Sequence, residues 1–293
     1  CLVGSEMCIR DRIDKAVRRI LSLKFQMGLF DDPFVDEKQA VQLVASSEHT
    51  GLAREVARQS IVLLKNKDKL LPLKKDIRTL AVIGPNADNV YNMLGDYTAP
   101  QADGTVVTVL DGIRQKVSKE TRVLYAKGCA VRDSSRTGFK DAIETARNAD
   151  AVVMVMGGSS ARDFSSEYEE TGAAKVTINQ ISDMESGEGY DRATLHLMGR
   201  QLELLEEISR LGKPVVLVLI KGRPLLMEGA IQEAEAIVDA WYPGMQGGNA
   251  VADVLFGDYN PAGRLTLSVP RSVGQLPVYY NTRRKGNRSR YIE

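Results

Sequence analysis

Short, wholly apolar runs rich in valine and isoleucine recur through the middle of this chain, with helix-like segments between them. The two strongest runs are residues 151–156, AVVMVM, and residues 215–220, VVLVLI. A run with no polar alternation has no side suited to water, so each is expected to be a strand covered on both faces. Strands of this kind that alternate with helices predict an α/β fold with a mostly parallel sheet sandwiched by helices.

The same periodicity assigns further elements around these two strands. Shorter strands are expected at residues 80–83, 122–125 and 236–241. Helices are expected at residues 13–28, 47–64, 110–117, 139–148, 199–211 and 247–255, with a charged connector at 65–75. The sequence therefore predicts five strands in one sheet, preceded by two helices.

Composition excludes several classes of protein. The chain has 293 residues, 43% of them hydrophobic, and a formal net charge of +1, without a basic stripe in its middle. Nucleic acid is therefore not expected as a partner, and the basic cluster at residues 283–290 is interpreted as a solvated tail. No apolar run reaches the roughly 18 residues of a membrane span. With two histidines and three cysteines, we expect no metal site and no cofactor.

The segment from residue 157 to 197 breaks the pattern. It has weak periodicity and is rich in Ser, Gly, Glu and Asp. A loop this long inside a compact domain is usually functional or disordered. Because it begins at the carboxyl end of a predicted parallel strand, where open α/β sheets bind their ligands, we expect it to carry the functional site.

Two glutamates in this segment are the candidates for acid catalysis. Residues 185–192 read ESGEGYDR, and glycines flank Glu188 on both sides. A mobile carboxylic acid suits proton transfer to a leaving oxygen, which is half of what a glycosidase needs. Glu185 is the competing candidate, Asp191 and Arg192 are expected to brace the loop, and a solvated loop carboxylate is the alternative without function.

Other chemistries find no support in the sequence. Three glycine-rich turns follow predicted strands, at residues 84–88, 157–162 and 244–249. None is a dinucleotide fingerprint or a phosphate-binding loop of the Gly-Lys-Ser/Thr type, and tight strand-to-helix packing explains all three. The chain also lacks a Gly-x-Ser-x-Gly motif. Nucleotide binding and serine-type acyl transfer are therefore disfavoured.

The chain resembles glycoside hydrolase family 3, in its β-glucosidase and β-xylosidase branch. The resemblance runs from Ile13 to the end and is most specific over residues 247–270, GGNAVADVLFGDYNPAGRLTLSVP. Residues 13–33 resemble the last helix of the family's barrel, residues 54–66 the start of its second domain, and residues 80–88 that domain's first strand. Residues 185–192 resemble its acid/base loop. Leu197-Met198 stands where the family usually has Leu-Pro.

The resemblance implies a fold and a mechanism. The fold would be a six-fold α/β sandwich preceded by a remnant helix of a TIM-like barrel. The activity would be retaining hydrolysis of non-reducing terminal β-glycosides, with Glu188 as general acid/base and a barrel aspartate, upstream of Ile13, as nucleophile. The chain alone is then expected to be inactive. Its partners would be a β-linked oligosaccharide and the missing barrel, and its location periplasmic or secreted.

Four further residues are expected to bind the substrate by this resemblance. Tyr97 and Thr98 lie in a loop similar to one that approaches the sugar, and Arg162 and Asp163 begin the acid/base loop. An internal salt bridge between Arg162 and Asp163 is an equal alternative. The sequence does not separate glucosidase from xylosidase, since the sugar-gripping residues would lie upstream.

The expected domain organisation has five parts. Residues 1–12 resemble translated sequencing-adapter tails and are expected to be an artefact, 13–36 the last barrel helix, and 37–76 a linker with a connecting helix. Residues 77–278 would form the α/β sandwich, and 279–293 the start of a linker to a fibronectin type III-like domain. The alternative function is a non-catalytic carbohydrate-binding or interaction module.

Overall fold

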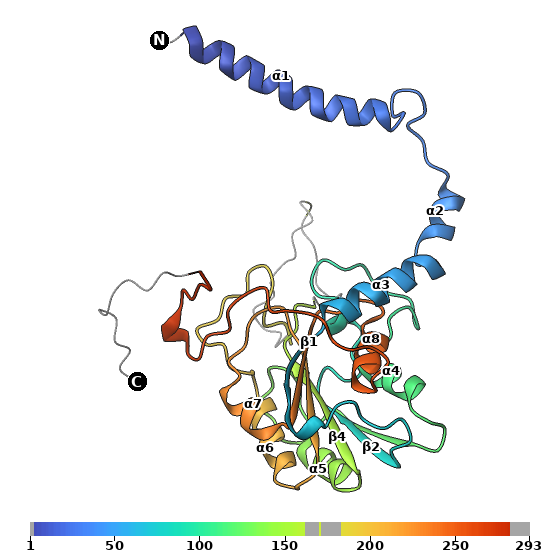
Figure 1. Cartoon of the computed structure of the whole chain (residues 1–293), viewed down its shortest axis with the longest axis vertical. Helices are drawn as coiled ribbons and strands as arrows, with labels where there is room; N and C mark the ends of the chain where they lie inside the picture. Colours follow the sequence, from blue (N-terminus) through green and yellow to red (C-terminus); the bar gives the residue numbers. More distant parts are fainter. Residues whose placement is uncertain (1–2, 162–169, 171–182, 282–293) are drawn as a thin grey trace. The chain divides into compact units, whose positions relative to one another are not determined.

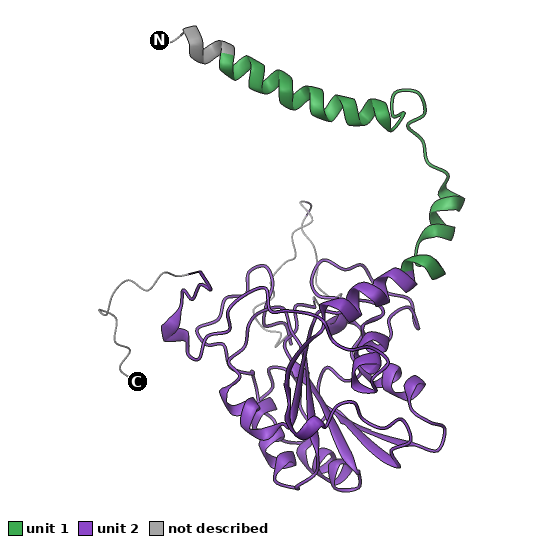
Figure 2. Ribbon diagram, in the orientation of Figure 1, with its two compact units in different colours: residues 1–49 green, residues 50–293 purple. Residues whose placement is uncertain are grey.

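The computed structural model describes residues 3–161, 170 and 183–281. The chain divides into two units, residues 1–49 and residues 50–293 (Figure 2). The first unit holds helices α1 (Val3–Gln26) and α2 (Glu37–Leu43) and the beginning of α3 (Ser47–Ser60). α1 ends at Gln26, close to the predicted end at Gly28, where a φ of +70° departs from the helical path, but it begins at Val3 and not at the expected Ile13. Ile13, Val17 and Ile20 on α1 are exposed.

The second unit is built on a six-stranded sheet with the order β1-β6-β5-β4-β2-β3 (Figure 1). β1 pairs antiparallel with β6, and every other pair is parallel. The strands are β1 (Val62–Asn66), β2 (Thr79–Ile83), β3 (Arg122–Ala126), β4 (Ala151–Gly157), β5 (Val215–Ile220) and β6 (Ala236–Trp241). The predicted α/β fold with a mostly parallel sheet is confirmed.

Helices cover both faces of the sheet, with a separate core under each layer. One core joins α3, α4 (Val109–Lys116) and α8 (Gly247–Leu255) to one face. The other joins α5 (Phe139–Arg147), α6 (Gln201–Ser209) and α7 (Glu228–Glu233) to the opposite face (Figure 1). Alternate residues of β4 serve the two cores: Val153 belongs to the first, and Val152 and Met154 to the second. This double burial explains why the run lacks polar residues.

Glycines set the distance between α4 and α8. A Cβ atom on Gly112 would lie 2.1 Å from the carbonyl oxygen of Gly248, and one on Gly248 would lie 1.9 Å from the carbonyl oxygen of Thr108. Neither approach leaves room for a side chain. Gly248, in the glycine-rich segment 244–249 that leads into α8, therefore permits close packing against α4, as the sequence predicted.

The helix expected at residues 47–64 was wrong in its second part. α3 ends at Ser60, Ile61 is fully buried, and residues from Val62 onward form β1, paired with β6 through Val62 and Asp239. The connector expected from Lys65 is correspondingly shortened, since Lys65 and Asn66 belong to this strand. Local periodicity favoured helix here, and pairing with a distant strand overrides it. The short α7 was also not predicted, nor were single 3-10 turns at Lys67–Lys69, Tyr91–Met93 and Val273–Gln275.

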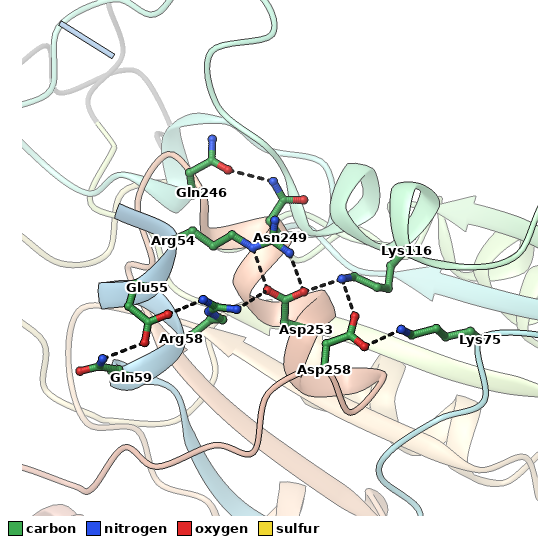
Figure 3. A network of polar contacts seen from close by, with 10 residues as sticks. All are labelled: Arg54, Glu55, Arg58, Gln59, Lys75, Lys116, Gln246, Asn249, Asp253 and Asp258. Atoms are coloured by element: carbon green, nitrogen blue, oxygen red, sulfur yellow. Dashed lines mark hydrogen bonds and ion pairs between the residues drawn. The ribbon is translucent and has the colours of Figure 1, made fainter. Parts of the chain in front are cut away.

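A buried carboxylate holds the first helical layer together (Figure 3). Asp253 on α8 accepts two hydrogen bonds from Arg54 of α3, at 2.8 and 2.6 Å, and one from Lys116 of α4 at 2.5 Å. Arg58 lies 3.6 Å away, and Lys116 also bonds Asp258 at 2.6 Å. Burial alone would raise the pKa of Asp253, but the hydrogen bonds from Arg54 and Lys116 outweigh it and lower that pKa.

Candidate active site

The carboxyl ends of four strands meet at one edge of the sheet. β4 continues into the turn at residues 158–160, β5 into 221–223 and β6 into Tyr242. Asn86, in the turn after β2, donates hydrogen bonds to the carbonyls of Gly158 (3.0 Å) and Ile220 (3.2 Å). The strand ends are thus tied to one another at the edge where open α/β sheets bind their ligands.

The described part of the long loop after β4, residues 183–200, is anchored to this edge at several points. The carboxylate of Asp183 accepts hydrogen bonds from the backbone N–H groups of Val131 (3.1 Å) and Arg132 (3.2 Å). The N–H groups of Glu185 and Ser186 donate to the carbonyl of Ser159, at 2.8 and 3.2 Å. The segment that carries both glutamates is therefore held against the end of β4.

Glu185 lies inside the protein. Its side chain is 1% exposed, and its Oε2 accepts a hydrogen bond of 2.6 Å from Arg192. Its Oε1 is buried without a hydrogen-bond partner among the described residues. A Cβ atom on Gly158 would lie 1.9 Å from Oε1, so the Glu185 carboxyl occupies space that any larger residue at position 158 would need. Arg223, which donates to the carbonyl of Tyr190 at 2.9 Å, approaches Oε2 to 3.6 Å.

Glu188, three residues later, is exposed. The glycines on either side have φ values of +115° (Gly187) and +81° (Gly189), backbone angles that favour glycine and turn this residue outward. The Tyr97 hydroxyl donates a hydrogen bond to Oε2 of Glu188. Tyr97 is 76% exposed and has a φ of +60°. The structure thus brings together two candidate residues that lie 91 positions apart in the sequence.

The structure describes some of the other predicted site residues but not all of them. Thr98 lies in the same loop as Tyr97, with its hydroxyl 3.5 Å from the carbonyl of Gly95. Arg162 and Asp163 lie outside the described residues. Arg192 braces the loop through its ion pair with Glu185 and a further hydrogen bond to the carbonyl of His196, whereas Asp191 is exposed.

Several supporting residues were missed by the sequence analysis. Gln201, fully buried at the start of α6, accepts a hydrogen bond from the N–H of Gly157 (2.8 Å) and donates to its carbonyl (2.9 Å). Ser159, Asn92 and Asn86 form a buried chain of side-chain hydrogen bonds of 2.6 and 2.7 Å. The sequence does not show that the side-chain amides of Asn86 and Gln201 bond to the ends of other strands, because those partners are distant in the chain.

Two kinds of feature are absent from the described residues. No group of three or more His, Cys, Asp or Glu side chains is arranged to hold a metal ion there. Within the same residues, none of the helices combines the length and the apolar character needed to cross a membrane.

Residues 61–293 match the model of the glycosyl hydrolase family 3 C-terminal domain. This range begins at the residue where α3 gives way to β1, and it includes all six strands. Because the match covers most of the chain, the chain belongs to glycosyl hydrolase family 3, whose members hydrolyse glycosidic bonds.

The proteins similar to this chain include β-xylosidases and β-glucosidases. The chain is 43% identical to a β-xylosidase of Formosa agariphila, over 92% of the chain and 35% of that protein. It is 38% identical to a periplasmic β-glucosidase of Salmonella typhimurium, over 96% of the chain and 37% of that protein. The chain thus spans about a third of the length of these relatives.

Solved structures of β-glucosidases are also similar to this chain. A β-glucosidase from Erythrobacter marinus superposes with a TM-score of 0.77 at 38% identity, over 94% of the chain and 37% of that protein. A Listeria innocua β-glucosidase in complex with isofagomine gives 0.76 at 32% identity, over 94% of the chain and 35% of that protein. The described fold is therefore one found in β-glucosidases of known structure.

Proposed function

We propose that this chain supplies the general acid/base of a retaining β-glycosidase, and that Glu188 is that group. The observation that carries the proposal is the contrast between the two glutamates. Glu185 is enclosed and paired with Arg192, so it has no path to a substrate. Glu188 is exposed between two glycines at the edge of the sheet and is oriented by the Tyr97 hydroxyl.

The reaction would proceed in two steps. In the first, a carboxylate nucleophile attacks the anomeric carbon while the Glu188 carboxyl donates its proton to the departing glycosidic oxygen. In the second, the Glu188 carboxylate takes a proton from water while the water oxygen attacks the anomeric carbon. The bond between the sugar and the nucleophile breaks, and the free nucleophile carboxylate is regenerated. The two carboxyl groups must lie about 5–5.5 Å apart in such an enzyme. By resemblance, the nucleophile is an aspartate of a barrel domain that precedes Ile13.

Substrate contacts are proposed for residues close to Glu188. Tyr97 presents an exposed aromatic ring beside the carboxylate, and Thr98 follows it in the same loop. Arg162 and Asp163 carry the donors and acceptors that sugar hydroxyls require. The proposed substrates are β-glucosides or β-xylosides attacked at the non-reducing end, the two activities named for the similar enzymes.

The proposed protein is longer than this chain. Residues 13–36 would be the last helix of the barrel, and 279–293 the approach to a fibronectin type III-like domain. The α/β sandwich, expected at 77–278, begins before residue 77, because β1 (Val62–Asn66) is a strand of its sheet, and the connection expected at 37–76 is correspondingly shorter. Exposed apolar side chains along α1, such as Ile13, Val17 and Ile20, support a neighbouring domain that covers them. The periplasmic relative supports a periplasmic or secreted location.

A chimaera tests the role of Glu188. The chain replaces the matching segment of the Salmonella typhimurium β-glucosidase, and kcat/KM is measured on aryl β-glucosides with good and poor leaving groups. We expect Glu188→Ala to reduce kcat/KM about 10²–10⁴-fold on poor leaving groups, which need protonation, and far less on activated ones. The chain by itself should give no turnover, because it would lack the nucleophile.

Glu185→Ala is the matched control. It removes a carboxylate three residues away, and any loss it causes should be the same for both kinds of leaving group. If Glu188→Ala lowers kcat/KM equally for substrates with good and poor leaving groups, or for neither, the result would favour a carbohydrate-binding loop over acid catalysis. Turnover by the chain alone, abolished by Glu188→Ala, would contradict the proposed division of the active site between two domains.

A further inference from the structure

A buried ion pair lies at the ends of β5 and β6, apart from the two glutamates. Lys221, the residue after β5, is 2% exposed, and Asp239 of β6 is 1% exposed. The Lys221 Nζ lies 2.7 Å from the Asp239 Oδ2. Burial lowers the pKa of Lys221 and raises that of Asp239, so the surroundings disfavour both charges. An apolar pair of similar size is often at least as stable, so stability does not explain this pair.

The ammonium group of Lys221 also faces the only tryptophan of the chain. Its Nζ lies 3.6 Å from the ring centroid of Trp241, a close cation–π contact. Trp241 has a φ of +54°, a backbone angle that is costly for a bulky side chain. The β5–β6 register shifts at this point, since Leu219 pairs with Asp239 but Ile220 pairs with Trp241. The ion pair therefore lies against a strained bulge, a feature that redirects the chain beyond it.

The redirected residue is Tyr242, which reaches the acid/base loop. Its hydroxyl lies 2.9 Å from the Ser186 hydroxyl, two residues before Glu188. Its ring fills the space beside two glycines: a Cβ atom on Gly222 or Gly95 would lie 2.5 or 3.0 Å from it. A continuous set of contacts thus runs from the buried ion pair, through the bulge, to the segment that carries the proposed acid/base.

We infer that Lys221 and Asp239 are positioning residues, which hold Trp241 in its strained conformation and thereby fix Tyr242 beneath the Glu188 loop. The cation–π contact and the ion pair orient the indole, and the backbone at Trp241 then directs Tyr242 towards Ser186. The pair specifies a local geometry and not the fold. Its importance for catalysis rests on the proposed role of Glu188, but the loop geometry can be measured without activity.

The test is a double variant of the 293-residue chain, Lys221→Met with Asp239→Asn, which removes both charges at nearly constant volume. Three measurements are made: thermal unfolding, the near-ultraviolet circular dichroism of Trp241, and hydrogen exchange over residues 184–190. We expect an unchanged unfolding midpoint, loss of the Trp241 signal, and exchange of the loop amides at least about tenfold faster. Exchange in β4 should remain as in the wild type.

The matched control makes the same charge changes at the opposite ends of the strands. Lys213→Met with Asp150→Asn, at residues just before β5 and β4, should leave both the Trp241 signal and the loop exchange unchanged. The inference is overturned if the Lys221→Met/Asp239→Asn variant keeps its Trp241 signal and loop protection. It is equally overturned if that variant does not fold, because the pair would then maintain the fold itself. Neither result depends on whether Glu188 is the acid/base.

Discussion

Two buried carboxylates in this protein have opposite surroundings. Asp253, in the helical layer, has both oxygens bonded to cations that come from α3 and α4 (Figure 3). Glu185, at the strand ends, has one oxygen bonded to Arg192 and the other without a hydrogen-bond partner among the described residues. Buried polar groups that lack partners are rare in folded proteins and concentrate where function requires them. Asp253 is thus held by several cations, although the Nε of Arg58 beside it lacks a hydrogen-bond partner among the described residues. The strand-end region leaves a carboxylate oxygen without a partner and also has strained backbone at Trp241.

The largest effect on stability is expected from neutralising Asp253. Asp253→Asn keeps the shape of the side chain but leaves Arg54, Arg58 and Lys116 around a site without charge. We expect the free energy of unfolding to fall by about 3 kcal/mol, measured by denaturant titration. The control is Asp258→Asn in the same network; this side chain is 34% exposed, so its loss should be about 1 kcal/mol or less. Equal losses for the two variants would mean that burial of Asp253 does not set its contribution.

A smaller effect is expected at the strand ends. Glu185→Gln removes the charge that pairs with Arg192, but Arg192 keeps its hydrogen bond to the carbonyl of His196. We expect a loss of about 1–2 kcal/mol in the free energy of unfolding. Glu188→Gln, at an exposed position, should change it by no more than about 0.5 kcal/mol. A larger loss for Glu188→Gln than for Glu185→Gln would reverse the roles assigned to the two residues.

The acid dependence of stability sharpens the contrast further. The folded pKa of Asp253 lies below its unfolded value of about 3.9, so the resulting stabilisation is fully present above that value. It is lost as the pH falls through the folded pKa. We therefore expect the wild-type chain to lose more stability than Asp253→Asn between about pH 5 and pH 2. Parallel curves for the two proteins in this range would contradict the cause assigned to the lowered pKa.

The parallel strands were predictable because each is a short, mostly apolar run that can be identified from its own residues. The run at residues 215–220 is apolar throughout and is buried on both faces, and the same holds for 151–156. The prediction was wrong at Val62–Asn66. Lys65 and Asn66 resemble the end of a helix in sequence, and this segment is a strand because it pairs with β6. Registers, and the bulge at Trp241, also depend on contacts between segments and leave no local sign.

The position of the candidate site was predictable from the sequence, but the burial and contacts of its residues were not. A long polar loop after a buried strand marked the place, and the flanking glycines marked Glu188. The sequence could not tell that Glu185 is buried, since an ESGEG motif looks equally solvated at both glutamates. Nor could it predict that Tyr97, from a distant loop, touches Glu188, or that Lys221 forms a buried pair.

Azide rescue of the chimaera is the sharpest test of whether Glu188 is the acid/base. In Glu188→Ala the second step lacks its base, so the glycosyl-enzyme should react slowly with water. Azide needs no deprotonation, and it should attack the anomeric carbon, displace the enzyme carboxylate and restore turnover of an activated β-glucoside. We expect a β-glucosyl azide product from Glu188→Ala and none from Glu185→Ala. No azide acceleration of Glu188→Ala, or rescue of Glu185→Ala instead, would contradict it.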